Sequence, residues 1–474
     1  MVSTTMHFMP GCEILQSFDL VHWEHVTYVY ETLDHTDAQQ LKSGQNIYGQ
    51  GMWAASLRYH EGRFYICFVA NDTRKTYLYT SEKIDGPWKK QLIEGFYHDG
   101  SLLFDEDGRN YIVYGNDEIW ITELNEDLTA PKKDGLHRLL VSDHKNPELG
   151  YEGSHIQKIN GYYYIFLIHS LRDRWMRTEA CFYSDSLEGE FTGGDVLCDD
   201  RGYCGQGVAQ GGIVDTPDGK WYAMLFQDSG AVGRIPILLP VTWKDHFPFF
   251  GQNGHVPEEI EVHSTRPGYI YQPLVGSDDF CNGLLPRWQF NHDPDPRYYH
   301  LDALQGTYTI TTREVCTELT QAVNTLTQRM SYPSCAAEVT VDASALKEGD
   351  VAGLCALQSC YAAVGITKHH GKYEVLMLDK KEDGILDMTE GAVVESHQMD
   401  FRLEADFCNM KDEARCYYRV NKGDWLPIGT VHKLYFKLDH FTGCRFGLFC
   451  YAAEETGGSA CFRDFKYYDV DEIS

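Results

Sequence analysis

A short unit that recurs four times in the first half of the chain limits the possible folds most strongly. Each copy reads as a short alternating strand, an acidic or polar turn with Gly, and a second strand rich in aromatic residues. The copies span residues 56–66, 101–113, 155–165 and 212–223. Any all-β protein alternates strands and Gly turns, but it does not require Gly followed by paired aromatics in one register. Strand repeats spaced by roughly 40–55 residues are typical of β-propellers, with one repeat for each blade.

The outer parts of the predicted blades repeat as well, and the chain opens on half a unit. Residues 15–23, 79–88 and 183–191 share a strand, a turn and an aromatic side chain. Residues 1–5 resemble only the second strand of a unit. Counting this half unit, we expect five blades in residues 1–262, the first of them truncated at its N-terminal end. A blade without its inner strand would expose an unpaired strand edge.

A second all-β domain is expected after the repeats. Turn residues mark a bridge at 263–277, and from there to residue 474 strands alternate without the blade repeat. Examples of these strands are residues 307–311, 336–341, 417–420 and 445–449. Helical periodicity is nearly absent. The predicted fold is therefore all-β, with a propeller in residues 1–262, a linker in 263–277 and a β-sandwich in 278–474.

Composition bears on the partners and the location. The formal net charge of −29 repels phosphate backbones, so no nucleic-acid partner is expected; solubility is the preferred explanation of the acidity. No apolar run is long enough to span a bilayer and no leader is seen, so no membrane partner is expected. The 15 cysteines lack metal-site spacing and suit buried thiols in a reducing compartment, which predicts a cytoplasmic protein. The oligomeric state is not predicted.

The four inner strands place polar residues at the rim of the predicted channel. When the strands are aligned, the rim positions are Trp53 and Ala54, His98 and Asp99, Glu152 and Gly153, and Ala209 and Gln210. Carboxylates from two different blades, Asp99 and Glu152, are what glycosidic cleavage requires. One acid protonates the leaving oxygen and the other supports the opposite face of the sugar. The alignment alone leaves turn-capping roles for both acids equally open.

Seven stretches spread over the whole chain carry a family resemblance. They are residues 4–11, 53–60, 99–102, 151–155, 230–234, 288–295 and 441–443. Together they resemble glycoside hydrolase family 43, and more narrowly its two-domain β-xylosidase and α-L-arabinofuranosidase members. The last two resemble that group's concanavalin-like sandwich. The resemblance implies a five-bladed enzyme that hydrolyses glycosides with inversion by means of three acidic residues.

The resemblance implies roles for the two rim acids. Glu152 matches the general acid, which must carry a proton near neutral pH. Asp99 matches the third acid of the family, which orients Glu152 and keeps it protonated through like-charge repulsion.

Five further residues are candidates for sugar binding. Arg234 matches an arginine that binds sugar hydroxyls, and Trp53, His7 and Phe8 are candidate walls of a pentose pocket. Surface packing is the alternative role for each of those three. Phe441 matches a sandwich residue that closes the active site in related enzymes. A pocket closed in this way favours the release of single sugars from chain ends or branches, although the sandwich could also be a stabilising partner only.

Two positions depart from the family pattern. The family's general base is an Asp in a Tyr-Pro-Asp-Pro-like segment that precedes the strand resembling residues 1–5, and no residue of this chain occupies that place. Asp19 lies in an outer turn and is not a substitute. Gln210 stands where many family members have a His that helps to hold calcium. Its amide oxygen could ligate a structural Ca²⁺ or could simply fill hydrogen bonds in the channel; no cofactor is expected to be required.

Two functions follow from these patterns. The first is a glycosidase that releases xylose or L-arabinose from xylo-oligosaccharides or arabinoxylan fragments, impaired in this chain by the absence of the general base. The second is a catalytically silent carbohydrate-binding propeller. The β-fructosidase clan also joins a five-bladed propeller to a sandwich, but the Arg-Asp-Pro and Glu-Cys pairs typical of it are absent from the sequence.

Overall fold

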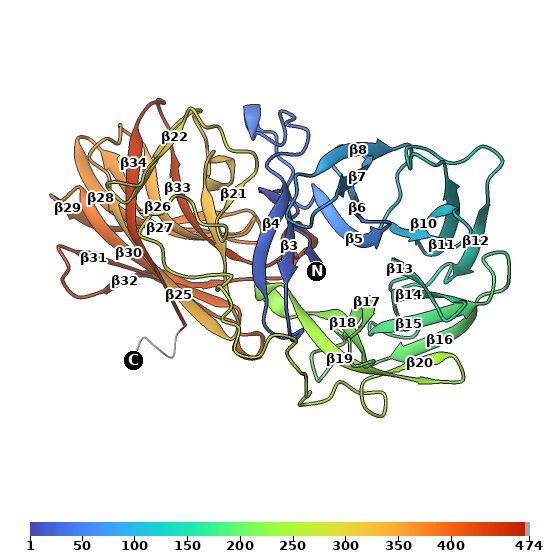
Figure 1. The fold of residues 1–474 in the computed structure, drawn as a ribbon. Helices are drawn as coiled ribbons and strands as arrows, with labels where there is room; N and C mark the ends of the chain where they lie inside the picture. The colour runs from blue at the N-terminus through green and yellow to red at the C-terminus, as the bar shows by residue number, and fades with distance from the viewer. Residues whose placement is uncertain (470–474) are drawn as a thin grey trace.

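A computed structural model describes residues 1–469, which form two all-β domains side by side (Figure 1). Five small sheets surround a common channel in the N-terminal part, and two large sheets pack together in the C-terminal part. The predicted fold, a five-bladed propeller followed by a β-sandwich, is confirmed. Within the described residues, no helix is long and apolar enough to cross a membrane.

Four of the five propeller sheets contain four antiparallel strands, each sheet in chain order. The second blade consists of β5 (Met52–His60), β6 (Arg63–Ala70), β7 (Lys75–Ser81) and β8 (Lys89–Ile93). The third consists of β9 (Ser101–Phe104), β10 (Asn110–Asn116), β11 (Glu118–Leu124) and β12 (His137–Ser142). The fourth consists of β13 (Glu152–Ile159), β14 (Tyr162–Ser170), β15 (Arg177–Ser184) and β16 (Thr192–Leu197). The fifth consists of β17 (Ala209–Asp215), β18 (Trp221–Asp228), β19 (Arg234–Lys244) and β20 (Phe247–Phe250).

The first propeller sheet has three strands, in the order β1-β3-β4. They are β1 (Val2–Ser3), β3 (Gly11–Gln16) and β4 (Glu24–Tyr30). The half unit at the start of the sequence forms β1, in which Val2 pairs with Ile14 and Ser3 with Glu13.

Alternation along the repeated strands builds the core between blades. In β14, Ile165 and Leu167 are buried in the cluster shared with the third blade, whereas Tyr164 and Phe166 are buried in the cluster shared with the fifth. Because successive side chains of a strand point to opposite faces, one aromatic-rich strand fills both interfaces of its blade. This is why the second strand of the repeat is apolar at nearly every position.

The sandwich consists of an eight-stranded and a seven-stranded sheet around one large core. The eight-stranded sheet has the order β2 (Phe8–Met9), β21 (Gln289–Asn291), β24 (Leu326–Arg329), β33 (Arg445–Tyr451), β26 (Val351–Leu357), β27 (Ala362–His369), β28 (Lys372–Lys380), β29 (Leu386–Val394). The seven-stranded sheet has the order β22 (Tyr299–Asp302), β23 (Thr307–Thr311), β34 (Ser459–Asp469), β25 (Ser334–Asp342), β30 (Gln398–Asp406), β31 (Glu413–Val420), β32 (Leu426–Lys433). Short 3₁₀ turns in the described chain are η1 (Lys42–Gly44), η2 (Gly230–Val232), η3 (Leu319–Gln321), η4 (Cys408–Met410) and η5 (Leu438–His440).

One strand from the propeller part of the sequence belongs to the sandwich. Phe8 of β2 pairs with Asn291, and Met9 pairs with Phe290, so β2 forms the edge of the eight-stranded sheet. Figure 1 shows the first blade, with β3 and β4, lying between the sandwich and the other blades. The two domains are therefore joined through main-chain hydrogen bonds, and the predicted limits at residues 262 and 278 stay predictions.

Candidate active site

The entrances of the inner strands meet at one end of the propeller channel. Glu152 is the first residue of β13, and Asp99 lies two residues before β9. Potential ligand atoms of His98, Asp99 and Glu152 all lie within 4.8 Å of one another. The structure thus brings together the two carboxylates that the strand alignment placed at the rim, while their roles stay predictions.

Irregular pairing at the strand entrances directs these side chains. The register shifts between Met52 and Ala55 in the second blade, and similar shifts follow Glu152 and Ala209 in the fourth and fifth blades. Such bulges bend a strand and re-aim its side chains. Gly153, inside the second of these shifts, has a φ of +67°, and a Cβ at this position would come within 2.6 Å of the Gln210 side chain. Only glycine suits that close approach.

The Glu152 carboxylate is partly exposed and receives one hydrogen bond. Asn116 donates from Nδ2 to Oε2 of Glu152 at 2.8 Å. The side chain of Glu152 is 21% exposed, whereas that of Asp99 is 6% exposed. A substrate can therefore reach Glu152 more easily than Asp99.

Asp99 is a buried acid with an unusual proton affinity. Burial is the main reason that the pKa of Asp99 is raised; His98 and Arg234 oppose the rise and Glu152 adds to it. Oδ1 of Asp99 is buried and has no hydrogen-bond partner in the described chain. These features agree with a carboxyl that acts on Glu152 through its charge and proton rather than by touching a sugar.

His98 lies between the two acids. Its Nε2 is 3.7 Å from Oδ2 of Asp99 and 3.7 Å from Oε2 of Glu152. Burial disfavours the charged imidazole, but the nearby carboxylates of Glu152 and Asp99 outweigh it and raise the pKa of His98. The ring also lies 6.1 Å from that of Trp53.

Arg234 is fixed between two aromatic rings and a buried carboxylate. Its guanidinium carbon lies 4.3 Å from the Phe226 ring centre and 4.2 Å from that of Phe441. Nε donates to Oδ1 of Asp228 at 3.1 Å, and the other oxygen of Asp228 pairs with Arg177. Burial lowers the pKa of Arg234, and Asp228 counteracts this. The guanidinium is thus held in one plane, which suits the hydrogen-bonding geometry of sugar hydroxyls.

Phe441 crosses from the sandwich to complete the wall of the site. It follows η5, is 3% exposed, and meets Trp53 edge to face at 5.5 Å between ring centres. Nε1 of Trp53 is buried without a hydrogen-bond partner within the described residues. Aromatic faces pack against the C–H faces of sugars, and a free indole N–H can bind a hydroxyl. The arrangement therefore offers apolar walls, a planar cation and two carboxyl groups in one place.

His7 and Phe8, the other predicted pocket walls, lie inside the domain interface. The ring of His7 lies 4.9 Å from His292 and 5.3 Å from His440, and the side chain is fully buried. Phe8 is also fully buried and packs under the guanidinium of Arg445, at 3.6 Å. Their contribution to a pocket wall stays a prediction that their burial does not favour.

Gln210 is held by acids rather than arranged as a cation ligand. Its Nε2 donates to Oδ2 of Asp99 at 3.4 Å, and its main-chain N donates to Oε2 of the fully buried Glu179 at 2.7 Å. Calcium prefers six to eight oxygen ligands. The side chain turns an N–H toward Asp99, so the observed contacts fit hydrogen bonding in the channel, and the calcium site stays an untested prediction.

The carboxylates of the first sheet are engaged elsewhere. Glu13 pairs with His25 at 3.2 Å and with Arg329 at 3.5 Å. Both oxygens of Glu24 accept hydrogen bonds, one of them from the main chain of Gln272. Asp19 accepts hydrogen bonds within its own turn, as expected for a turn-capping residue. None of these three is free to serve as a general base.

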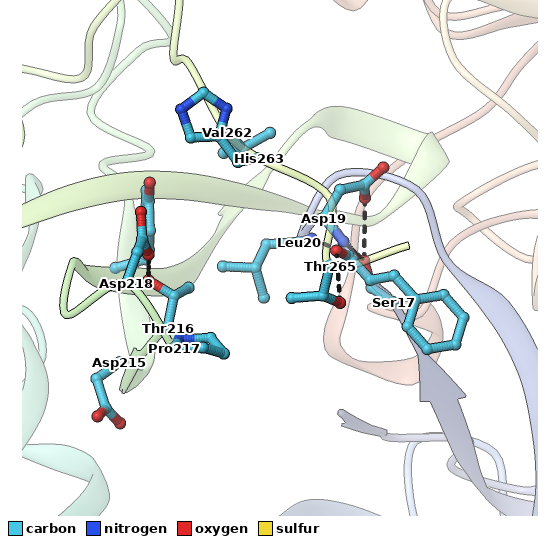
Figure 2. A pocket seen from close by; sticks show the side chains of 12 residues that line it. Ser17, Asp19, Leu20, Asp215, Thr216, Pro217, Asp218, Val262, His263 and Thr265 are labelled. Atoms are coloured by element: carbon cyan, nitrogen blue, oxygen red, sulfur yellow. Dashed lines mark hydrogen bonds between the residues drawn. The ribbon is translucent and has the colours of Figure 1, made fainter. Parts of the chain in front are cut away.

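A cavity of about 170 Å³ lies elsewhere, between the first and fifth blades (Figure 2). Its lining includes Asp19 and the turn of residues 215–218. Asp215 ends β17, whereas Gln210 lies near the beginning of that strand, so the cavity is at the other end of the strand from the acid cluster. Thr216 donates to Asp218 at 2.6 Å, one of the contacts drawn in Figure 2, and the polar groups there stabilise their own turns.

Several residues of the site receive no role from the sequence. The strand alignment places His98 at the rim without a role, and it gives no indication of Asn116, Arg177, Phe226 or Asp228. Antiparallel pairing of β9 with β10 could have indicated Asn116, because it brings the end of β10 back to the rim beside His98. The others depend on contacts between blades, which the repeat pattern does not contain.

Two families of known domains match the chain. Glycosyl hydrolases family 43 matches residues 1–248, and the β-xylosidase C-terminal concanavalin A-like domain matches residues 277–468. The matches together cover the propeller and the sandwich.

Individual known proteins agree with these matches. A β-xylosidase from Formosa agariphila is 25% identical over 99% of this chain and 85% of its own length. A non-reducing end α-L-arabinofuranosidase from Bacteroides ovatus is 23% identical over 82% of this chain and 75% of its own length. Among solved structures, a bifunctional GH43-CE protein from Bacteroides eggerthii has a TM-score of 0.91 and 41% identity. That match covers 99% of this chain, which spans 60% of the Bacteroides eggerthii chain.

Proposed function

The chain belongs to glycosyl hydrolases family 43, and from this premise we propose that it is an inverting, exo-acting glycosidase for pentose-containing oligosaccharides. The substrates proposed are xylo-oligosaccharides or arabinoxylan fragments, from which it releases xylose or L-arabinose. The names of its relatives, β-xylosidase and α-L-arabinofuranosidase, support this substrate class.

One observation carries the proposal: the partly exposed Glu152 lies beside a buried second acid, in a site whose wall is made by both domains. Glu152 and Asp99 come from neighbouring blades, and Arg234 and Phe441 form the wall. A general acid needs access to the leaving oxygen, while a second carboxyl that stays inaccessible can act on the first only through its charge and its proton. The difference in exposure between the two acids fits this division of roles.

The proposed reaction uses Glu152 as the proton donor. The bond between the anomeric carbon and the glycosidic oxygen breaks, its electron pair moves to that oxygen, and the oxygen takes the proton from Glu152. Water supplies the hydroxyl that binds the anomeric carbon from the opposite face and gives its own proton to a base. Arg234 binds hydroxyls of the sugar, and Phe441 and Trp53 shield the site from bulk solvent, so that only the attacking water reaches the anomeric carbon.

The exo mode is proposed from the contribution of the sandwich. Phe441 closes the wall beside Trp53 and Arg234, and a closed wall leaves room for a chain end rather than for a continuous chain. Single sugars would accordingly be released.

A second candidate function, sugar binding without turnover, is favoured by the state of the first-sheet carboxylates. Glu13, Asp19 and Glu24 are all engaged with other partners. Inversion requires a carboxylate that activates water. With these three carboxylates engaged, we expect the activation of water to be the impaired step.

The two candidates are separated by assays on nitrophenyl β-xyloside, nitrophenyl α-L-arabinofuranoside and xylobiose, with and without azide. A glycosidase that lacks only its base should hydrolyse slowly and gain rate with azide, which bonds to the anomeric carbon in place of water. Glu152→Gln should then abolish xylobiose turnover, while activated substrates lose less. Calorimetric binding of xylobiose without product, even with azide, would support the silent binding protein instead.

A further inference from the structure

Two side chains that the proposed reaction does not yet use meet the same oxygen of the general acid. Asn116 donates from Nδ2 to Oε2 of Glu152 at 2.8 Å, and Nε2 of His98 lies 3.7 Å from this same oxygen. Within residues 1–469, no hydrogen bond reaches the other oxygen, Oε1. The two oxygens of this carboxyl are therefore not equivalent.

Main-chain hydrogen bonds hold both side chains in place. The N–H of Gly115 donates to the carbonyl of His98 at 3.1 Å, which ties the end of β10 to the segment before β9. The N–H of Asp117 donates to the carbonyl of Tyr151 at 2.9 Å, which ties the same hairpin to the residue before Glu152. The hairpin is thus anchored on both sides of the acid, and the third blade presents an amide and an imidazole to a carboxyl of the fourth.

We propose that Asn116 and His98 are positioning residues that hold Glu152 by Oε2, so that Oε1 carries the proton delivered to the leaving oxygen. The proposal rests on the proposed function. An amide N–H donates to a lone pair, and a proton on Oε2 pointing at that N–H would meet another hydrogen. The acidic proton is therefore directed to Oε1.

The positioning also supports the product of proton transfer. When the bond to the leaving oxygen breaks, that oxygen takes the bonding electron pair and the Oε1 proton, and Glu152 becomes a carboxylate. Its negative charge then faces the Asn116 N–H and the His98 ring at Oε2. Hydrogen bonds to ionised groups are stronger than those to neutral groups, so the contacts strengthen as the reaction proceeds.

The charged groups around His98 determine whether its imidazole is protonated. Asp99 and Glu152 favour its charged form, whereas burial and Arg74 oppose it. The positive charge of Arg234 acts on both acids. The balance raises the pKa of His98 when Glu152 is a carboxylate, which is its state after proton delivery, so the ring can then donate toward Oε2.

Hydrolysis of two classes of substrate distinguishes positioning from a structural role. Dinitrophenyl glycosides leave without a proton, whereas xylobiose requires one. Asn116→Ala and His98→Gln are expected to lower kcat on xylobiose by about 10²-fold, the size of a general-acid effect, and to change kcat on dinitrophenyl xyloside by less than about threefold. Asn116→Gln should restore part of the loss, because it returns an amide donor. Azide is present in every assay, so that a slow water-activation step does not mask proton delivery.

Matched control substitutions are available outside the site. Asn125→Ala removes an amide from an outer turn of the same blade, where it bonds Thr129, and His60→Gln replaces a ring that stacks on Phe104. Both substitutions should leave the ratio of kcat on xylobiose to kcat on dinitrophenyl xyloside unchanged. Equal losses on both substrates in Asn116→Ala and His98→Gln, or no loss on either, would overturn the proposal.

A second readout does not depend on turnover. The imidazole of His98 is titrated by NMR in the unaltered chain and in Glu152→Gln, which keeps the shape and removes the charge. Glu152→Gln should lower the pKa of His98, because the contact that raises it is lost. An unchanged pKa would overturn the pairing of His98 with Glu152. A lowered pKa in a chain that hydrolyses no substrate would support the pairing and contradict the proposed function, so the two failures are distinguishable.

Discussion

Asp228 shows how a residue with no direct role in the proposed reaction can control the site. Its carboxylate, 2% exposed, forms an ion pair with Arg177 through one oxygen and with Arg234 through the other. Two guanidinium groups therefore depend on one buried counter-charge. A buried charge that loses its partner is far more costly than an exposed one.

Asp228→Asn is accordingly expected to lower the free energy of unfolding by about 3–5 kcal/mol. It should also raise KM more than it lowers kcat, because Arg234 loses its fixed orientation without any change in Glu152. Urea unfolding and steady-state kinetics measure the two effects. Asp218→Asn, at a carboxylate that is 50% exposed, is the control and should change neither quantity. A loss below about 1 kcal/mol in Asp228→Asn would show that the two arginines find other partners.

The rim acids were predictable from the sequence and their partners were not. Asp99 and Glu152 stand at matching places in a repeat, so aligning the strands was enough to bring them together. Phe441 was expected from family resemblance alone, because nothing in its local sequence indicates the propeller. Asn116 and Asp228 act across blade interfaces, and a repeat read one blade at a time contains no information about them.

At the scale of elements, two tight turns bring the sandwich into close contact with the beginning of β19. Gly233, immediately before Arg234, has a φ of +93°, and a Cβ there would lie 2.6 Å from the main-chain N of Gly443. Cys444 donates its N–H to the carbonyl of Ala231 at 2.9 Å. These contacts set how closely Phe441 approaches Arg234.

Gly233→Ala should separate the two turns and displace Phe441 from Arg234. A clash of this kind costs about 1–3 kcal/mol, in addition to about 1–2 kcal/mol for the left-handed backbone. Gly219 has a similar φ of +79°, but a Cβ added there would have no atom within 4 Å, so Gly219→Ala bears the backbone cost alone. The thermal unfolding temperature and the KM for nitrophenyl xyloside should both differ between Gly233→Ala and Gly219→Ala. Equal behaviour of the two would mean that the contact between the turns does not position the site.

The pairing of β2 could not be predicted from local sequence patterns. Only two residues long, this strand pairs with β21 at a separation of about 280 positions in the sequence, a distance over which alternation gives no signal. Phe8 lies in a stretch that carries the family resemblance, which is why a pocket wall is predicted there. Its burial beneath Arg445 follows from the sandwich, which could be placed only with the whole chain folded.

At the scale of the whole molecule, uncharged histidines lie where the two domains meet. Burial lowers the pKa of His7 well below the ordinary value, and His292, His440 and Arg445 lower it further. Burial likewise lowers the pKa of His292 to about 3. Neither nitrogen of His7 has a hydrogen-bond partner in the described chain.

These shifts predict that the domains are less stable in acid. Below a pH of about 6.5 the unfolded chain takes up protons that folded His7 and His292 refuse, so stability present above this pH is lost as the pH falls. Each histidine contributes a loss of about 2 kcal/mol between pH 7 and pH 5. The free energy of unfolding, measured with urea at pH 7 and at pH 5, should fall by less in His7→Asn than in the unaltered chain. The same substitution at the partly exposed His60, which lies outside the domain interface, should leave this change in unfolding free energy as it is in the unaltered chain. An unaltered change in His7→Asn would mean that His7 accepts a proton in the folded state.

The placement of the sugar tests the central claim most directly, because it does not depend on turnover. We expect a crystal structure of the Glu152→Gln variant soaked with xylobiose to show the terminal pentose between Trp53 and Arg234, under Phe441. The glycosidic oxygen should lie at hydrogen-bond distance, about 2.6–3.2 Å, from the former Oε1 position of residue 152. Xylobiose bound only in the cavity between the first and fifth blades, or only on the sandwich, would contradict the assignment of this end of the propeller as the active site.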